Sequence, residues 1–169
     1  MKKTLLIACV VISVLVFSCS NNSTEPEDEK LILSIIPSEQ TVNTGSEATY
    51  SVKIENVSDL FAISCEIVFN NGVVGVPIDP VTKGDFWGDD TIITTKINYD
   101  RLCVAIGQIQ TSGEDGLDGD GILFDFKVTG ILAGESDLIF QNLNLIDENG
   151  EQVDDFDEIE INNGKLIIQ

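Results

Sequence analysis

Histidine is absent from this 169-residue chain, and basic residues are few: 9 lysines and arginines stand against 29 aspartates and glutamates, for a net charge of −20. Without histidine, the chain lacks the commonest general base, the usual zinc ligand and the base of Ser-His and Cys-His nucleophile pairs. The charge argues against nucleic acid as a partner, because such affinity comes from lysine and arginine neutralising phosphates. Most familiar hydrolase mechanisms and nucleic-acid binding are therefore disfavoured.

Helical periodicity and internal repeats are also missing, which argues against a helical bundle, a solenoid or a propeller. The hydrophobic fraction of 43% is ordinary for a globular protein. The acidity therefore belongs to the surface of a folded domain rather than to a disordered chain.

The first residues read as an export signal. Lys2 and Lys3 precede an apolar run of 13 residues, from Leu5 to Phe17. A membrane-spanning helix needs about 20 apolar residues, so this run suits the core of a cleaved signal peptide. The sequence Val16-Phe17-Ser18-Cys19 resembles the lipobox of bacterial lipoproteins. This resemblance implies that residues 1–18 are removed and that Cys19 becomes the lipidated first residue.

Residues 19–30 are polar, acidic and without a hydrophobic core of their own, so we expect a flexible tether between the lipid and a domain at 31–169. Acyl chains hold a protein on a membrane without a transmembrane helix. We therefore expect an exported protein anchored in the bacterial cell envelope, at the outer membrane or the cell surface.

Side-chain alternation runs through the chain from residue 31 onward. In 48–55, Tyr50, Val52 and Ile54 share one face, and in 61–70 the odd-numbered apolar residues share one face while the even-numbered residues share the other. Further candidate strands, separated by Asn-Gly and Asp-Gly turns, are 31–36, 73–78, 91–99, 101–108, 121–129, 136–146 and 164–168.

About nine half-buried strands in one domain predict an all-β fold, because two packed sheets are the natural way to bury their apolar faces. We expect a nine-stranded antiparallel two-sheet sandwich with jelly-roll topology.

Four segments resemble cohesin domains in sequence and in order. The segment 47–69 (EATYSVKIENVSDLFAISCEIVF) resembles their opening strands, and 81–88 (VTKGDFWG) their V-x-x-G-D-F loop. The segment 119–128 (GDGILFDFKV) resembles their G-D-G-x-L strand, and 143–150 (LNLIDENG) with 163–168 (NGKLII) their closing strands. The chain departs from many cohesins at 70–72, where Asn-Asn-Gly replaces Tyr-Asp-Pro.

The resemblance implies a non-enzymatic surface module that captures dockerins and so collects polysaccharide-degrading proteins. It implies no cofactor, and any calcium belongs to the dockerin. It also implies a docking face on the third, fifth, sixth and eighth strands of the family, with Ser64 and Glu66 at its two polar positions on the third. Alternation adds further outward positions. The full set of expected partner contacts is Ser64, Glu66, Val68, Thr94, Lys96, Asn98, Arg101, Cys103 and Ala105.

Other functions remain open. A carbohydrate-binding module on the same scaffold would use Trp87 and Phe86 to stack on a sugar ring, unless these aromatics fill the end of the sandwich. A secreted hydrolase or a structural envelope protein is a third interpretation, although no carboxylate pair stands out among the 29 acids.

Two cysteines of the domain invite a disulfide in an exported protein. Alternation places Cys65 inward and Cys103 outward, on opposite faces of a sheet, where they cannot pair. We therefore expect free thiols.

Two acidic clusters invite a calcium site, but neither has the ligand spacing of an EF-hand, so we expect solvated turns and no metal. The clusters are Asp115, Asp118 and Asp120, and Asp147, Asn149, Asp154, Asp155 and Asp157.

Overall fold

The computed structural model describes residues 30–109, 115–153 and 158–169, so the signal peptide, Cys19 and the tether up to residue 29 lie outside it. Asp154, Asp155 and Asp157 also lie outside the described residues. Within the described ranges, no helix is long and apolar enough to cross a membrane. The regular structure there consists of β1 (Ile32–Ile36), β2 (Glu39–Val42), β3 (Glu47–Leu60), β4 (Ala62–Val68), β5 (Val74–Gly75), β6 (Val81–Lys83), β7 (Thr91–Asn98), β8 (Arg101–Gln108), β9 (Leu117–Gly130), β10 (Gly134–Ile146), β11 (Glu160–Asn162) and β12 (Gly164–Ile168).

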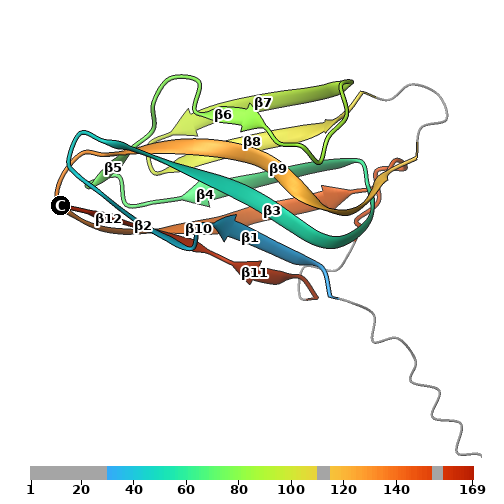
Figure 1. The fold of residues 1–169 in the computed structure, drawn as a ribbon. Helices are drawn as coiled ribbons and strands as arrows, with labels where there is room; N and C mark the ends of the chain where they lie inside the picture. The colour runs from blue at the N-terminus through green and yellow to red at the C-terminus, as the bar shows by residue number, and fades with distance from the viewer. Residues whose placement is uncertain (1–29, 110–114, 154–157) are drawn as a thin grey trace, which may run out of the picture.

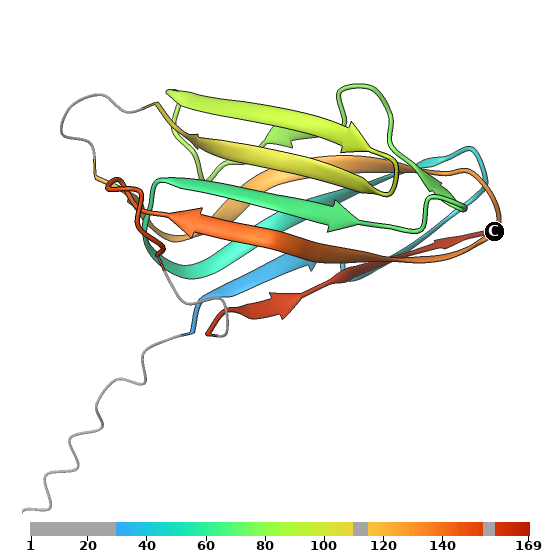
Figure 2. The same ribbon diagram turned by 180° about the vertical axis from the view of Figure 1, so that it is seen from behind.

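The strands form two six-stranded sheets packed face to face (Figure 1). One sheet runs β11-β1-β3-β9-β5, with β6 also paired to β9, and the other runs β2-β12-β10-β4-β8-β7. Figure 2 shows β10, β4, β8 and β7 side by side in one layer, with β7 at its edge. The predicted all-β two-sheet sandwich is confirmed.

The strand count and the purely antiparallel pairing differ from the prediction. The described residues hold twelve strands, because β2, β6 and β11 are only 4, 3 and 3 residues long and too short to show alternation. Residues 73–78 contribute only the two-residue strand β5. Two pairs, β1 with β11 and β2 with β12, are parallel, so both sheets are mixed.

The core lies between the sheets and is built by the alternation seen in the sequence. Tyr50, Val52 and Ile54 of β3 are all fully buried, as predicted. The Tyr50 hydroxyl donates a hydrogen bond of 2.7 Å to the Lys165 carbonyl, which satisfies its polar end inside the core. Burial raises the pKa of Tyr50 to about 12, with smaller effects from Gln40 and Glu39.

Local irregularities bend the long pair β3 and β9. Their register shifts between Ile54 and Val57 and again before Leu60, and the backbone of Asn56 and Asp59 takes positive φ values of 59° and 60°. At each bend, an aspartate of β9 accepts the freed backbone N–H: Asp120 from Asn56 at 2.7 Å and Asp118 from Asp59 at 2.8 Å. These two carboxylates therefore have a structural role, because they replace ladder hydrogen bonds lost at the bulges.

Candidate protein-docking face

The outward side of β4, β8, β7 and the part of β10 that pairs with β4 (residues 139–146) forms one continuous plane, here called the outer face. The register places Ser64 beside Ala105, and Ala105 beside Thr94, in one row across three strands. The next row is Glu66, Cys103 and Lys96, followed by Val68, Arg101 and Asn98. All nine residues predicted as partner contacts therefore lie on one face, with Thr94, Lys96, Asn98 and Ala105 exposed and the others partly buried.

A polar cluster occupies one end of the outer face. Arg101 Nη1 donates to Glu66 Oε2 at 2.6 Å, and Asn142 Nδ2 donates to the same oxygen at 2.9 Å. Arg101 also donates through Nε and Nη2 to the two carboxylate oxygens of Asp100, at 2.9 and 3.3 Å. Glu66 and Arg101 are mutually satisfied and keep side-chain exposures of 22% and 29%. The pair is therefore fixed in place yet accessible to a partner.

The charges of the cluster reinforce one another. The hydrogen bond from Arg101 lowers the pKa of Asp100, and the contacts with Asp100 and then Glu66 raise the pKa of Arg101. Both side chains therefore stay charged over the physiological pH range. Cys103 lies within this group, and partial burial followed by the Glu66 charge raises its pKa, so its thiol is protonated near neutrality.

Acidic residues are scarce on the outer face although they dominate the sequence. Among the outward positions of β4, β8, β7 and the part of β10 paired with β4, Glu66 is the one acid, whereas Lys96 and Arg101 are basic. The chain as a whole carries −20. The face is thus a nearly neutral plane on a strongly acidic protein, and charge depletion of this kind is typical of the core of a protein interface.

A shallow hollow occupies the opposite end of the outer face. It encloses about 200 Å³, and its floor consists of the small residues Ala62, Ala105 and Gly107, with Ile92 and Thr94 of β7 at its side. Ile92 is 58% exposed, so the hollow presents apolar surface to solvent. The hollow spans the rows of Ala62 and Ser64, and the polar cluster spans the rows of Glu66 and Val68, so their centres lie four residues, or about 13 Å, apart along β4.

Strand β10 contributes residues that the sequence analysis did not assign to the face. The outward positions here are Ile139, Gln141, Asn144 and Ile146. Alternation does not predict these outward positions, because a bulge between Gln141 and Asn144 shifts the outward side chains from odd-numbered to even-numbered residues. Within the bulge, Asn142 has a φ of 48° and its side-chain amide donates to Glu66. Asparagine is one of the few residues that adopt a positive φ readily. The presence of an asparagine at position 142 was therefore the only sign in the sequence of an irregularity at this point.

The aromatic pair Phe86 and Trp87 packs into the sandwich. Trp87 is 4% exposed, and its indole N–H donates to the Leu123 carbonyl at 2.9 Å. Its ring packs edge-to-face with that of Phe86, with the ring centroids 5.3 Å apart. Phe86 is partly buried and packs against the core. This placement agrees with the alternative in which these aromatics fill the end of the sandwich, and the buried indole ring of Trp87 has no face open to a sugar.

The two described cysteines lie on opposite faces of adjacent strands, as alternation predicted. Cys65 is buried and paired in register with Val104, whereas Cys103 lies opposite Glu66, and both thiols are free. Burial raises the pKa of Cys65 to about 12, with smaller contributions from Cys103 and Glu66. Cys65 is therefore an inert core residue at neutral pH.

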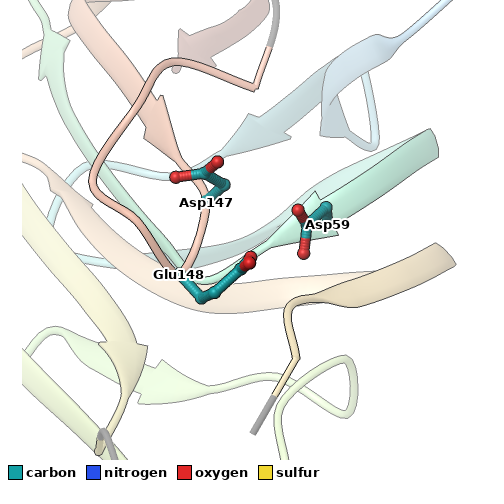
Figure 3. A group of neighbouring side chains, drawn as sticks. All are labelled: Asp59, Asp147 and Glu148. Carbon is teal, nitrogen blue, oxygen red and sulfur yellow. The ribbon is translucent and has the colours of Figure 1, made fainter. Parts of the chain in front are cut away.

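Three carboxylates meet where the turn after β10 passes the end of β3 (Figure 3). One oxygen from each of Asp59, Asp147 and Glu148 lies within 4.8 Å of the others. Such an oxygen set is the kind that binds hard cations. However, the Asp147 Oδ1 atom accepts the backbone N–H groups of Asn149 and Glu151, and Asp59 Oδ1 accepts that of Gly116, at 2.8 to 3.0 Å. These contacts explain the cluster as a turn-fixing network, and we assign it no metal.

Comparison with known proteins gives a clear structural answer. No protein-family model and no curated protein sequence matches the chain. Among solved structures, a non-cellulosomal cohesin from Archaeoglobus fulgidus matches with a TM-score of 0.63 at 24% identity, over 83% of this chain and 90% of that one. The chain has the cohesin fold.

Two further cohesin structures agree. A type I cohesin–dockerin complex from Clostridium thermocellum gives a TM-score of 0.66 at 14% identity, over 83% of this chain and 94% of that one. The third ScaC cohesin of Acetivibrio cellulolyticus, solved with a dockerin, gives 0.64 at 16% identity, over 82% and 98%.

Proposed function

We propose that this protein is a recognition module that binds a dockerin-type module on the outer face of β10, β4, β8 and β7. The observation that carries the proposal is the depletion of acids on this face, where Glu66 is the one acid among the paired outward positions of a chain of charge −20. A flat plane of small and neutral side chains loses little solvation when a partner covers it. Complexes of other cohesins with dockerins support the choice of partner.

The two ends of the face suggest how a partner helix would lie. The hollow above Ala62 and Gly107 accepts an apolar side chain, and burying one such group gives a binding hot spot. The cluster of Glu66, Arg101 and Asn142 offers charged groups whose positions are already fixed. A helix that crosses the face would therefore place an apolar residue at one end and polar residues at the other, which favours one orientation.

Titration calorimetry with a panel of calcium-loaded dockerins tests the proposal. Ala105 is exposed in the middle of the face, so Ala105→Arg places a long cation where the partner must approach, and we expect an affinity loss of at least ~30-fold, or about 2 kcal/mol. Thr49→Arg is the matched control, because Thr49 is also an exposed strand residue but lies on β3 of the other sheet. Equal binding by both variants would place the partner elsewhere.

The double variant Ser64→Ala/Glu66→Ala tests the predicted polar contacts of β4 separately. We expect weaker dockerin binding, because Glu66→Ala removes the acceptor of Arg101 and Asn142 and so disperses the polar cluster. If this double variant binds with unchanged affinity while Ala105→Arg still weakens binding, the outer face remains the docking site, but Ser64 and Glu66 do not contact the partner.

The lipid anchor at Cys19 is part of the same proposal, and it rests on the Val16–Cys19 motif after a signal-like apolar run. An anchored module with a polar tether displays its docking face at the surface of the cell envelope. In a bacterial host, we expect Cys19→Ser to move the protein from the membrane fraction to the soluble fraction and to abolish fatty-acid labelling. Retention of the label would contradict the assignment.

A further inference from the structure

Strand β7 is an unusually long free edge. It spans 8 residues at the end of its sheet, and residues 92–98 are all exposed. The strands at the other sheet ends, β2, β11, β5 and β6, are only 4, 3, 2 and 3 residues long. Figures 1 and 2 both show β7 along the outer margin of the sandwich. Short edge strands are a usual protection against pairing with another chain, and β7 lacks it.

The side chains of β7 favour pairing rather than oppose it. The strand reads TIITTKIN, with neither proline nor glycine and Lys96 as its one charge. Isoleucine is exposed on both sides of the strand: Ile92 at 58% on the outer face, and Ile93 and Ile97 at 36% and 47% on the inner side. A β-branched, nearly neutral edge is the type of strand that accepts another strand.

We propose that a second copy of this chain pairs with β7 through its own β7, antiparallel, with the two-fold axis at Thr95. Residues opposite each other in a sheet share a face, so even-numbered residues must meet even-numbered ones. With Thr95 on the axis, Ile93 lies opposite Ile97 of the second copy, and the exposed isoleucines cover one another twice. Lys96 then lies opposite Thr94.

Neighbouring registers are less favourable, which is why β7 itself is the best occupant of this edge. An axis at Lys96 would place two lysines directly opposite each other. An axis at Thr94 would place Ile97 opposite Thr91 and Lys96 opposite Ile92. Of these three registers, only the one with the axis at Thr95 places isoleucines opposite each other and keeps the two lysines apart, so the strand is complementary to itself.

The pairing has a structural consequence. A two-fold axis perpendicular to the sheet leaves both outer faces on the same side of the dimer, where each remains open to a partner. One strand pair buries less than the roughly 1,200 Å² at the low end of stable interfaces, so the dimer is weak. The charge of −20 on each copy opposes association at long range, and salt should therefore strengthen it.

Sedimentation velocity of the purified domain, from about 10 µM to about 1 mM and in low and high salt, tests the inference without any dockerin. Two variants that add the same charge should act in opposite directions. Thr95→Glu places two carboxylates opposite each other on the axis and should weaken the dimer by about threefold or more. Thr94→Glu places each carboxylate opposite Lys96 of the second copy and should strengthen the dimer by a similar factor.

Both threonines are exposed, so neither variant should disturb the fold, and circular dichroism checks this. Thr95→Cys in a Cys103→Ser background should cross-link into a dimer under mild oxidation, whereas Thr94→Cys in that background should not. A monomer at every concentration, equal behaviour of the two glutamate variants, or cross-linking at Thr94 in preference to Thr95 would each overturn the proposal. Because no dockerin is present, failure here leaves the docking function untouched.

Discussion

Arg101 donates to Glu66 across the β4–β8 pair at 2.6 Å, and Asn142 of β10 donates to the same carboxylate oxygen at 2.9 Å. Three strands of the outer face are thus joined through one carboxylate. The Glu66 carboxylate therefore already accepts hydrogen bonds within the protein, and a partner would contact a cluster of charged and polar groups whose positions are fixed rather than one unpaired carboxylate.

The Glu66–Arg101 pair should matter more for docking than for stability. The pair is partly exposed, so the coupling in a double-mutant cycle of Glu66→Gln and Arg101→Met should stay below about 1 kcal/mol in urea unfolding. Dockerin affinity, measured by calorimetry on the same four proteins, should fall with either change. A large coupling in unfolding with unchanged affinity would show that the pair is purely structural.

The two thiols should differ in reactivity. Cys65 is buried with a pKa of about 12, so alkylation of the native protein at pH 8 should leave it unmodified until the protein unfolds. Cys103 is partly exposed, and its raised pKa should make its alkylation slow but faster with rising pH. Mass spectrometry of timed samples distinguishes the sites. Modification of Cys65 before Cys103 in native protein would contradict the assigned faces.

Trp87 should be a stability residue. Trp87→Ala removes a large buried side chain and one of the two hydrogen bonds that the Leu123 carbonyl accepts, the other coming from the Gly84 N–H, so we expect a loss of about 3–5 kcal/mol in unfolding free energy. Tyr99→Ala is the control, because Tyr99 is an aromatic residue that is 88% exposed, and its loss should cost less than about 0.5 kcal/mol. Similar effects of the two changes in denaturant melts would place Trp87 outside the core.

The cluster of Asp59, Asp147 and Glu148 should give opposite pH effects at two neighbouring residues. A hydrogen bond to its own backbone lowers the pKa of Glu148, but the Asp59 side chain, burial and the charges of Asp59 and Asp147 together raise it above 4.5. The folded state then binds more protons than the unfolded state just above pH 4.5, so wild-type stability falls as pH rises through this window. Glu148→Gln should remove that decline.

Asp147 should behave in the reverse sense. Hydrogen bonds from the backbone of Glu151, followed by those from Asn149 and Gly150, lower its pKa below 3.8. The stability it contributes is therefore present above pH 3.8 and is lost as pH falls through the folded pKa, so Asp147→Asn should be most destabilising near neutrality. The unfolding free energies of Glu148→Gln and Asp147→Asn, measured from pH 3 to 7 and compared with the wild type, check the direction of each effect. The same pH dependence in both variants would contradict the prediction.

The sequence predicted the sheets better than their edges. Alternation in 48–55 and 61–70 placed the buried and outward residues of β3 and β4 correctly, because a period of two follows directly from strand geometry. It could not reveal β2, β6 and β11, whose 3 or 4 residues carry no period, nor their pairing partners. Parallel pairing of β1 with β11 depends on contacts between distant segments, and no local pattern encodes those.

The candidate face shows the same limit. Ser64, Glu66, Arg101 and Lys96 fell on one side because their strands are regular. Asn142 was missed because a bulge breaks the alternation at that point, and the meeting of Asp59 with Asp147 was missed because β3 and the turn after β10 are far apart in sequence.

Each of the first two strands has a sheet neighbour at the far end of the sequence: β1 pairs with β11 as well as with β3, and β2 pairs with β12. A ribosome would therefore release most of the domain before either layer could be completed. Such late closure slows folding, because long loops must be ordered before their contacts form. A nascent chain that closes late stays unfolded for longer, and this would suit the export that we propose for the protein.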